Sequence, residues 1–393
     1  MEGPIEINLG AVISMSPSLV GRSTGVMYGT SPKWPNSRLV VKVSWVDDYR
    51  VSEQDFMDKA AEEATKPGHE WALNYLPRFF YVEDVNHLTD TPVRELFKVA
   101  CLENKEYTYE RRQMRFVVQE PLHPFKTPTN VKDVGQVMLD VACGTCHPHS
   151  RTPPTHTGLV YRWLYDHPGI LHGDLSSSDI MYRIVEDKVH GVLTDYDLSS
   201  WRDTPAPECA KGPERATGTP PYMAQELLRG TSAIHLYRHD VESLFYVMLL
   251  MCGRHTIGNA RGESNEAGPQ VIMREGKLPY QGWFKGQDWA LGCVKVTFIL
   301  NMLAIELSPP FEDFRPWLRK LQLLFSEGFS LWSANLRRKQ CPEMCAGGPI
   351  PFDDETLGGW IDYLTLIEST RNLTGELKGL IIRYDPRSTS DFD

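Results

Sequence analysis

The sequence predicts an α+β protein made of two lobes, a small β-rich N-lobe and a larger, mainly helical C-lobe. The chain has 393 residues, a length that typically corresponds to about two to three domains. Short strand-like runs with turns fill its first part, and apolar residues at helical spacing recur from Asn130 onward. Ten Trp and 28 Pro favour a loop-rich mixed fold over a simple helical bundle. We place the lobes at residues 1–120 and 121–385, and we expect a disordered tail at 386–393.

The composition excludes several classes of protein. A net charge of -10 argues against a nucleic-acid partner, because phosphate contacts need a basic surface. No apolar run reaches the roughly 18 residues of a membrane span, and the first residues lack the basic start and apolar stretch of a signal peptide. Eight scattered cysteines are typical of reduced thiols. We therefore expect a soluble intracellular protein, cytoplasmic or nuclear, without a membrane partner.

Two features stand out in the sequence of the N-lobe, a pair of glycines and a lysine. Gly21 and Gly25 lie near a strand-like run, and such glycines let backbone N–H groups approach phosphates. Their spacing does not match G-x-G-x-x-G, and a plain hairpin explains them equally well. Lys42 is a single lysine within an apolar strand from Leu39 to Trp45. The alternative for Lys42 is an edge strand that carries one solvated lysine.

A helix is predicted from Val51 to Ala64, where apolar residues recur at helical spacing. Three of its acids are candidates for an ion pair with Lys42, namely Glu53, Glu62 and Glu63. A strand from Met114 to Gln119 should then end the N-lobe, with Glu120 to Leu122 as the hinge between the lobes.

Further along, apolar spacing predicts helices at Asn130–Cys143, Asp288–Leu307 and Asp313–Phe325, with a loop-like stretch from Gly253 to Gly286. The run from Cys143 to His147 has the C-x-x-C-H spacing of haem attachment and could supply metal ligands. No second C-x-x-C pair completes a zinc site, so ordinary thiols are the favoured interpretation.

Two acids of the C-lobe, Asp174 and Asp195, each follow a short apolar run. Between them, two short strands joined by a turn at Glu186 and Asp187 are expected. A carboxylate just beyond an apolar strand is held at the edge of a core, where catalytic bases and metal ligands are commonly placed. Either acid alone could be a turn or N-cap residue, but two in this order make that interpretation the weaker one.

This spacing resembles the catalytic core of protein kinases, H-R-D-L-x-x-x-N followed by D-F-G. Here the sequence is His172-Gly173-Asp174-Leu175, three serines, Asp179, and later Asp195-Tyr196-Asp197. The amino-acid sequence of this stretch is similar to that of the fungal-type protein kinase family in particular. Two more stretches, Gly218 to Leu228 and His239 to Tyr246, are also similar to that family. The resemblance extends from about Gly21 to Gly359.

The resemblance implies a bilobal kinase-like fold and an ATP-dependent phosphotransferase, a protein Ser/Thr kinase that transfers the γ-phosphoryl group of ATP to a hydroxyl of a protein substrate. Asp174 would accept or orient the proton of that hydroxyl. Asp195 would bind Mg²⁺, or Mn²⁺, at the ATP phosphates, and Asp179 would help to hold a second ion. Lys42 would neutralise phosphate charge and would pair with Glu53, which matches the family's sequence pattern. Glu63 is the second candidate for this ion pair.

The resemblance also assigns supporting roles. Gly21 and Gly25 would border the phosphates, and the hinge at Glu120 and Leu122 would pair with adenine through its backbone. Two further acids would be structural: Glu226 would pair with an arginine that the sequence does not identify, and Asp240 would brace the catalytic loop.

The chain departs from the kinase pattern at Gly173, which replaces an arginine, and at Asp179, which replaces an asparagine. Asp197 replaces the glycine of D-F-G, as it does in the fungal-type family. Without the arginine, no cation of this loop receives a phosphorylated activation segment, so we expect activity that survives phosphatase treatment. These departures favour a pseudokinase or nucleotide-binding scaffold as the first alternative. The second is a small-molecule kinase of the aminoglycoside phosphotransferase type, which shares His-Gly-Asp-Leu but lacks the segment at Gly218 to Glu226.

Overall fold

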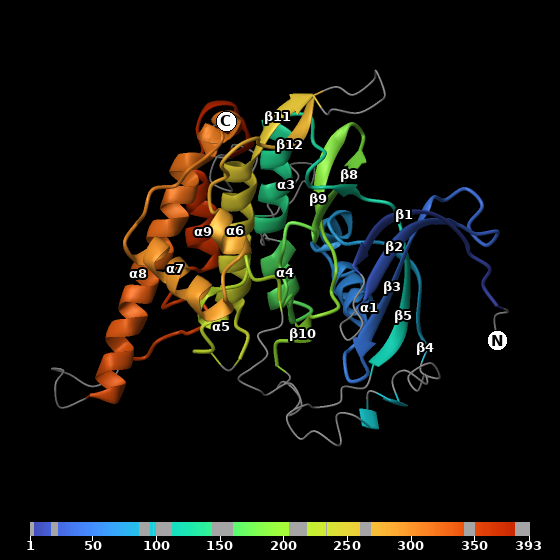
Figure 1. The fold of residues 1–393 in the computed structure, drawn as a ribbon, viewed down its shortest axis with the longest axis horizontal. Coiled ribbons are helices and arrows are strands. Elements are labelled where there is room, and N and C mark those ends of the chain that lie inside the picture. Colours follow the sequence, from blue (N-terminus) through green and yellow to red (C-terminus); the bar gives the residue numbers. More distant parts are fainter. Residues whose placement is uncertain are drawn as a thin grey trace. The chain divides into compact units, whose positions relative to one another are not determined.

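A computed structural model describes residues 4–16, 23–85, 95–96, 98–99, 112–143, 160–203, 218–232, 234–259, 269–341 and 350–381 (Figure 1). It confirms a mixed α/β protein with a β-rich N-terminal part and a helical C-terminal part. The chain separates into two compact units, Met1–Asp58 with Leu76–Leu122, and Lys59–Tyr75 with His123–Asp393. Gly21 and the tail at 386–393 lie outside the described residues. No helix within the described ranges is both long and apolar enough to cross a membrane.

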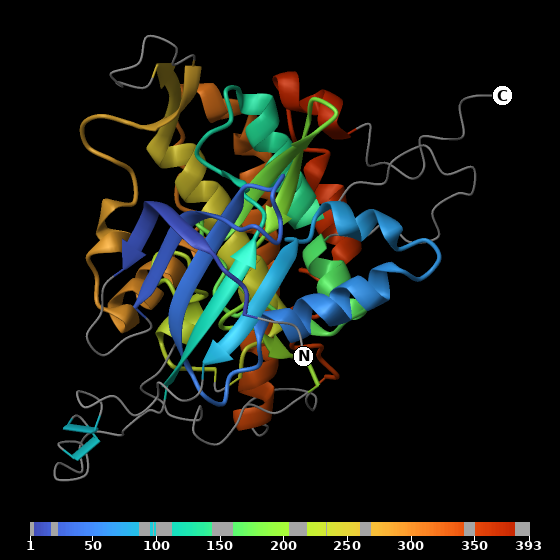
Figure 2. The ribbon, with the colours of Figure 1, turned by 90° about the vertical axis from the view of Figure 1, so that its right-hand side faces the viewer.

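The first unit contains a five-stranded antiparallel sheet in the order β1-β2-β3-β5-β4 (Figure 2). Its strands are β1 (Asn8–Ser16), β2 (Thr24–Thr30), β3 (Leu39–Asp47), β4 (Phe79–Val85) and β5 (Arg112–Gln119). Leu39, Val41 and Val118 form the buried core of this sheet. Because β3 lies between β2 and β5, Lys42 is on an inner strand and the edge-strand alternative is wrong.

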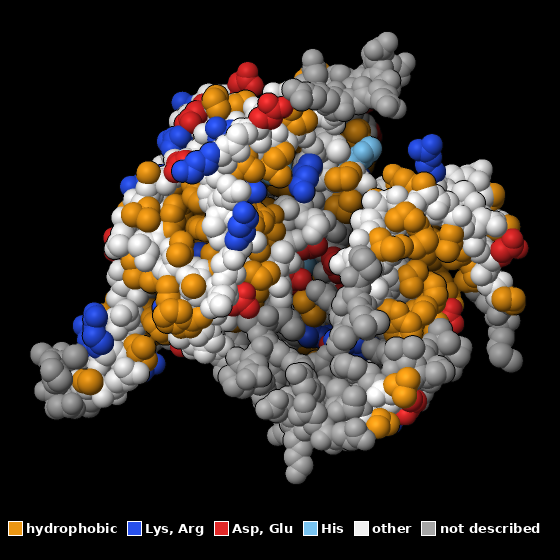
Figure 3. Space-filling view, viewed as in Figure 1, with side chains coloured by type: hydrophobic (Ala, Val, Ile, Leu, Met, Phe, Trp, Pro, Cys, Tyr) orange, Lys and Arg blue, Asp and Glu red, His pale blue; other side chains and the backbone are white. Residues whose placement is uncertain are grey.

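Strand β1 forms one edge of the sheet and is exposed along its whole length. Hydrophobic side chains gather over β1 and β2 in Figure 3. The large hydrophobic residues of β1 and β2 that are exposed are Leu9, Val12, Ile13, Met15 and Tyr28.

Helix α1 (Glu53–Ala64) begins in the first unit and ends in the second. Phe56, Ala60 and Ala64 are fully buried at intervals of four residues, so a single apolar stripe holds the helix. Arg115 of β5 also holds the backbone just before α1 in place. The buried guanidinium of Arg115 donates to the backbone carbonyls of Arg50 and Val51 and forms an ion pair with Asp84. A 3-10 turn, η1 (Glu70–Asn74), follows α1.

The second unit is mainly helical. Its helices are α3 (Val131–Cys143), α4 (Val160–Asp166), α5 (Gln225–Leu228), α6 (Tyr237–Arg254), α7 (Asp288–Leu300), α8 (Arg315–Gln340), α9 (Tyr363–Thr370) and α10 (Lys378–Ile381), with 3-10 turns η4 (Gln281–Phe284), η5 (Pro309–Phe314) and η7 (Gly375–Leu377). Every residue of α6 is buried, so this helix is the centre of the unit.

Short sheets complete the second unit. They are β6 (His123–Pro124) with β8 (Ile180–Val185) and β9 (Lys188–Leu193), β7 (Ile170–Leu171) with β10 (Ser200–Trp201), and β11 (His255–Asn259) with β12 (Pro269–Met273). The predicted strands between the two acids are confirmed as β8 and β9. Glu186 and Asp187 both have positive φ in the turn that joins them, as the tight turn of a two-residue hairpin requires.

Three predictions for the second unit are wrong in extent. Helix α7 ends at Leu300 instead of Leu307, because a turn with a left-handed Met302 follows it. Helix α8 continues to Gln340, well beyond Phe325. The stretch from Gly253 to Gly286, predicted to be a loop, contains the β11–β12 hairpin and a 3-10 turn.

Candidate active site

Within the first unit, Lys42 forms a buried ion pair with Glu53. The Nζ atom of Lys42 lies 2.9 Å from Oε1 of Glu53, and the two residues are 8% and 2% exposed. Glu63, the second candidate for a pair with Lys42, accepts hydrogen bonds from Lys66 instead. A buried ammonium needs a partner of this kind, since an isolated charge in the interior is costly. The central strand and the first turn of α1 therefore hold the lysine and the glutamate together in an ion pair.

The other predicted nucleotide contacts of the first unit have mixed support. Gly25 lies on β2, where an added Cβ would come no closer than 3.6 Å to Met27, so space alone does not require glycine there. The backbone N–H of Glu120 donates to the carbonyl of Arg78 at 3.1 Å. Any adenine contact from Glu120 would then have to use its carbonyl oxygen. Leu122 ends this unit.

Within the second unit, Asp174 lies in the loop that follows β7. Its Oδ1 accepts hydrogen bonds from the backbone N–H of Thr219 at 2.8 Å and from the Thr219 hydroxyl at 3.0 Å. Gly218 makes this approach feasible: its φ is +154°, and an added Cβ would lie 2.9 Å from the Met223 side chain. The segment before α5 thereby orients the Asp174 carboxylate.

Asp179 immediately precedes β8, Asp195 lies just beyond the end of β9, and the two are linked through Thr194. The Thr194 backbone N–H and hydroxyl donate to the carbonyl of Asp179 at 2.8 Å and 3.1 Å. Asp195 follows at once, with a left-handed φ of 64°. Left-handed non-glycine residues are uncommon and gather at functional sites, where the surrounding structure holds them in place.

The carboxylates of Asp174, Asp179 and Asp195 interact electrostatically. Burial first, and then the charges of Asp195 and Asp174, raise the pKa of Asp179 well above its usual value. Hydrogen bonds from Ser176 oppose this shift. Like charges disfavour one another's ionised form, and a divalent cation reverses that effect. A group of carboxylate oxygens is the donor set that Mg²⁺ prefers, so these residues fit the predicted metal.

The loop that carries Asp174 is braced by Asp240, which is fully buried on α6. Its carboxylate accepts the backbone N–H of His172 at 2.9 Å and of Gly173 at 3.2 Å. It also accepts the Tyr161 hydroxyl and Nε2 of His235. Burial raises the pKa of Asp240, but His235, His172 and Tyr161 outweigh it and lower the pKa to about 2. Asp240 is thus a permanent anion that fixes the loop backbone.

Gly173 cannot be replaced by a larger residue without rearrangement. Its φ is +84°, and an added Cβ would lie 2.5 Å from the carbonyl oxygen of Leu198. The departure from H-R-D at this position therefore has a local structural reason.

Residues 159–252 match the family model of fungal protein kinase.

This match confirms the family resemblance over the segment that contains Asp174, Asp179, Asp195 and Asp240. It supports a kinase-like protein and does not include Lys42 or Glu53. No curated protein shows significant similarity to the chain.

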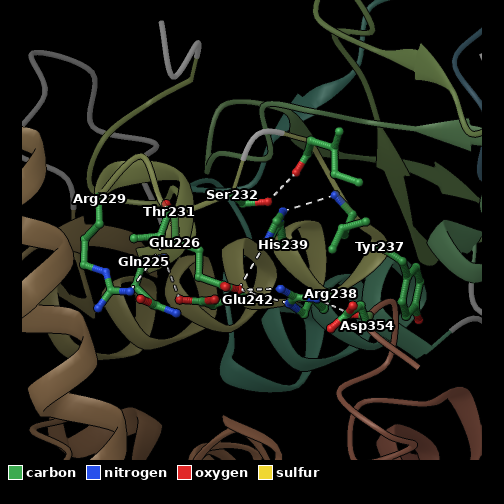
Figure 4. A network of polar contacts seen from close by, with 12 residues as sticks. Gln225, Glu226, Arg229, Thr231, Ser232, Tyr237, Arg238, His239, Glu242 and Asp354 are labelled. Carbon is green, nitrogen blue, oxygen red and sulfur yellow. Dashed lines mark hydrogen bonds and ion pairs between the residues drawn. The ribbon is translucent and has the colours of Figure 1, made fainter. Parts of the chain in front are cut away.

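The kinase-like segment also contains the arginine that the sequence left unidentified. Glu226 accepts hydrogen bonds from Nη2 of Arg238 at 2.7 Å and from Nε at 3.1 Å (Figure 4). His239 Nε2 lies 3.4 Å from the same carboxylate oxygen, and Arg238 also donates to the carbonyl of Asp354. The position of Arg238 in the first turn of α6, two residues before Asp240, was the available signal.

Sequence reasoning missed Lys295 of α7. This lysine is fully buried, and its Nζ donates to the carbonyls of Met223 at 2.6 Å and Pro220 at 3.1 Å. Its Nζ also lies 4.1 Å from the ring centre of Tyr246. Burial lowers the pKa of Lys295 well below its usual value. Lys295 thus holds the backbone of the segment that delivers Thr219 to Asp174.

Proposed function

We propose that this protein is an ATP-dependent protein kinase that transfers the γ-phosphoryl group of ATP to a serine or threonine hydroxyl. One observation carries the proposal: burial first, and then the charges of Asp195 and Asp174, raise the pKa of Asp179 well above its usual value. Perturbed acids of this kind are typical of catalytic and metal sites. The family match over residues 159–252 supports the same chemistry.

In the proposed reaction, the substrate hydroxyl oxygen bonds to the γ-phosphorus while the bond from that phosphorus to the β-γ bridging oxygen breaks. Asp174, oriented by Thr219, accepts the hydroxyl proton, and ADP leaves. Lys42, paired with Glu53, would bind the phosphates. Asp195 and Asp179 would hold Mg²⁺ or Mn²⁺, which supplies positive charge at the phosphates when bound.

Two further functions remain as alternatives. A nucleotide-binding pseudokinase is favoured by Asp179, because a third carboxylate adds negative charge next to the other two. A small-molecule kinase of the aminoglycoside type is disfavoured, since Thr219 of the segment that those enzymes lack donates directly to Asp174.

The decisive experiment is ATP turnover with Mg²⁺ on a peptide mixture, alongside equilibrium binding of ATP. We expect Asp174→Asn and Asp195→Asn each to lower turnover by about 100-fold or more, since each removes a group that acts in the transition state. Asp174→Asn should still bind ATP. Asp187→Asn is the matched control, because this acid is exposed in the β8–β9 turn of the same segment.

The outcomes separate the three functions. Unchanged turnover in Asp174→Asn would refute the proposed role of that residue. ATP binding without turnover in the unmodified chain would identify a pseudokinase. Turnover on small hydroxyl compounds but on no peptide would identify the aminoglycoside-type alternative.

A further inference from the structure

A second cluster of ligand-type side chains lies within the second unit, apart from the three carboxylates. Glu63 is near the end of α1, His69 precedes η1, and His167 follows α4. Each offers one ligand atom, and these atoms all lie within 4.8 Å of one another. The two imidazole ring centres are 4.3 Å apart. Residues distant in the sequence thus bring two imidazoles and a carboxylate together.

The backbone at each of these positions is fixed by local hydrogen bonds. The Glu63 carbonyl accepts the N–H of Lys66 at 3.2 Å, and the N–H of His69 donates to the carbonyl of Lys66 at 3.0 Å. The N–H of His167 donates to the carbonyl of Trp163 at 3.0 Å. The Trp163 ring also packs edge-on against His69. Ligands on a fixed backbone lose little freedom when a metal binds.

We propose that Glu63, His69 and His167 form a binding site for Zn²⁺. Two histidines and one glutamate are a recognised zinc donor set that leaves a fourth position for water. Imidazole nitrogen disfavours Mg²⁺ and Ca²⁺, which prefer oxygen alone. Zinc bonds of about 2.1 Å place tetrahedral ligand atoms roughly 3.4 Å apart. The cluster must therefore contract, and the exposed side chain of His167 can rotate to achieve this.

Lys66 is the group that competes with the metal. Its Nζ lies 2.6 Å and 2.8 Å from the two carboxylate oxygens of Glu63. The Lys66 side chain is 54% exposed, so it can turn into solvent when zinc binds. Lys59 lies farther away, 3.6 Å from the carboxylate. Removing the Lys66 ammonium should therefore tighten zinc binding, an effect that a purely structural role of the cluster does not predict.

The test is a calorimetric titration of the full chain with Zn²⁺. It uses a Cys143→Ser, Cys146→Ser background, because that thiol pair has metal-ligand spacing of its own. In this background we expect His167→Ala to weaken zinc binding by at least about tenfold. Lys66→Gln should strengthen it several-fold. His123→Ala is the matched control, because it removes an exposed histidine elsewhere in the same unit.

Cobalt provides a second readout that does not depend on affinity. Co²⁺ bound by nitrogen and oxygen should give weak visible bands without the sulfur charge-transfer absorption of thiolate ligands, and His167→Ala should abolish these bands. The thermal midpoint of His167→Ala without metal reports whether the variant is folded. Zinc binding that His167→Ala leaves unchanged, or that Lys66→Gln weakens, would overturn the proposal.

Discussion

Gly173 shows at the scale of one residue why a kinase motif changes in this chain. A side chain at this position would need a left-handed backbone and would collide with the Leu198 carbonyl. The N–H of Gly173 is meanwhile held by Asp240. The close approach of Leu198 and the bond to Asp240 together select glycine, because neither the position nor the direction of this backbone can adjust freely.

This reasoning predicts that Gly173→Ala destabilises the fold by about 3 kcal/mol, the sum of backbone strain and the displacement of Leu198. Gly276→Ala is the control, since Gly276 has a similar φ of +87° but no atom within 4 Å of an added Cβ. The control should lose only about 1 kcal/mol. Urea unfolding of both variants measures the difference, and equal losses would contradict the proposed clash.

At the scale of elements, the contact of α5 with α6 depends on a buried charged group. Glu226 on α5 pairs with Arg238 and His239, both in the first turn of α6. Burial raises the pKa of Glu226, but His239 and Arg238 outweigh it and lower the pKa. His239 itself is fully buried with a pKa lowered to about 4, by burial first, so it is neutral near pH 7. Arg238 therefore carries the compensating charge.

We predict that Arg238→Met costs about 3–5 kcal/mol, because it leaves the Glu226 carboxylate buried without its cation. Glu226→Gln should cost a similar amount by leaving Arg238 uncompensated. The double variant should lose less unfolding free energy than the sum of the losses in the two single variants. A double-mutant cycle of unfolding free energies measures this coupling, and strictly additive losses would show that the pair does not act as a unit.

Strands and helices with strong periodicity could be predicted from the sequence, and the charged contacts between distant segments could not. The apolar runs around Lys42 and between Asp174 and Asp195 identify β3, β8 and β9. The choice of Glu53 over Glu63 needed the family resemblance, because both acids lie on the same helix. The β11–β12 hairpin was missed, since its strands are short and have mixed polarity.

The candidate site could be predicted only in part, for a physical reason. Asp174, Asp179 and Asp195 follow from motif spacing, which is local in the sequence. Lys295 acts through backbone carbonyls some 72 residues away, and no sequence pattern marks a lysine for burial there. The proposed zinc site likewise joins His167 to Glu63 and His69, about a hundred positions earlier, so only the folded chain reveals it.

At the scale of the whole molecule, buried ionisable groups set the pH dependence of stability. Glu242 is fully buried on α6 and accepts hydrogen bonds from the Tyr246 hydroxyl and the N–H of Gln225. Burial raises its pKa from 4.5 to about 7, against the opposing effects of Tyr246, Gln225 and Lys295. The folded state thus keeps a proton that the unfolded chain releases at a lower pH.

The sign of the effect follows from proton linkage. Between pH 4.5 and about 7 the folded state binds more protons at Glu242 than the unfolded state does, so this residue lowers stability as the pH rises through that window. Glu242→Gln removes the ionisation. We therefore predict that the free energy of unfolding of Glu242→Gln, relative to the unmodified chain, rises by about 3 kcal/mol from pH 4.5 to pH 8. Urea unfolding across this range measures the difference, and Glu376→Gln, at an exposed position, should give a flat difference. A flat difference for Glu242→Gln as well would mean that the buried carboxyl stays ionised throughout, with Lys295 as the nearby cation that stabilises it.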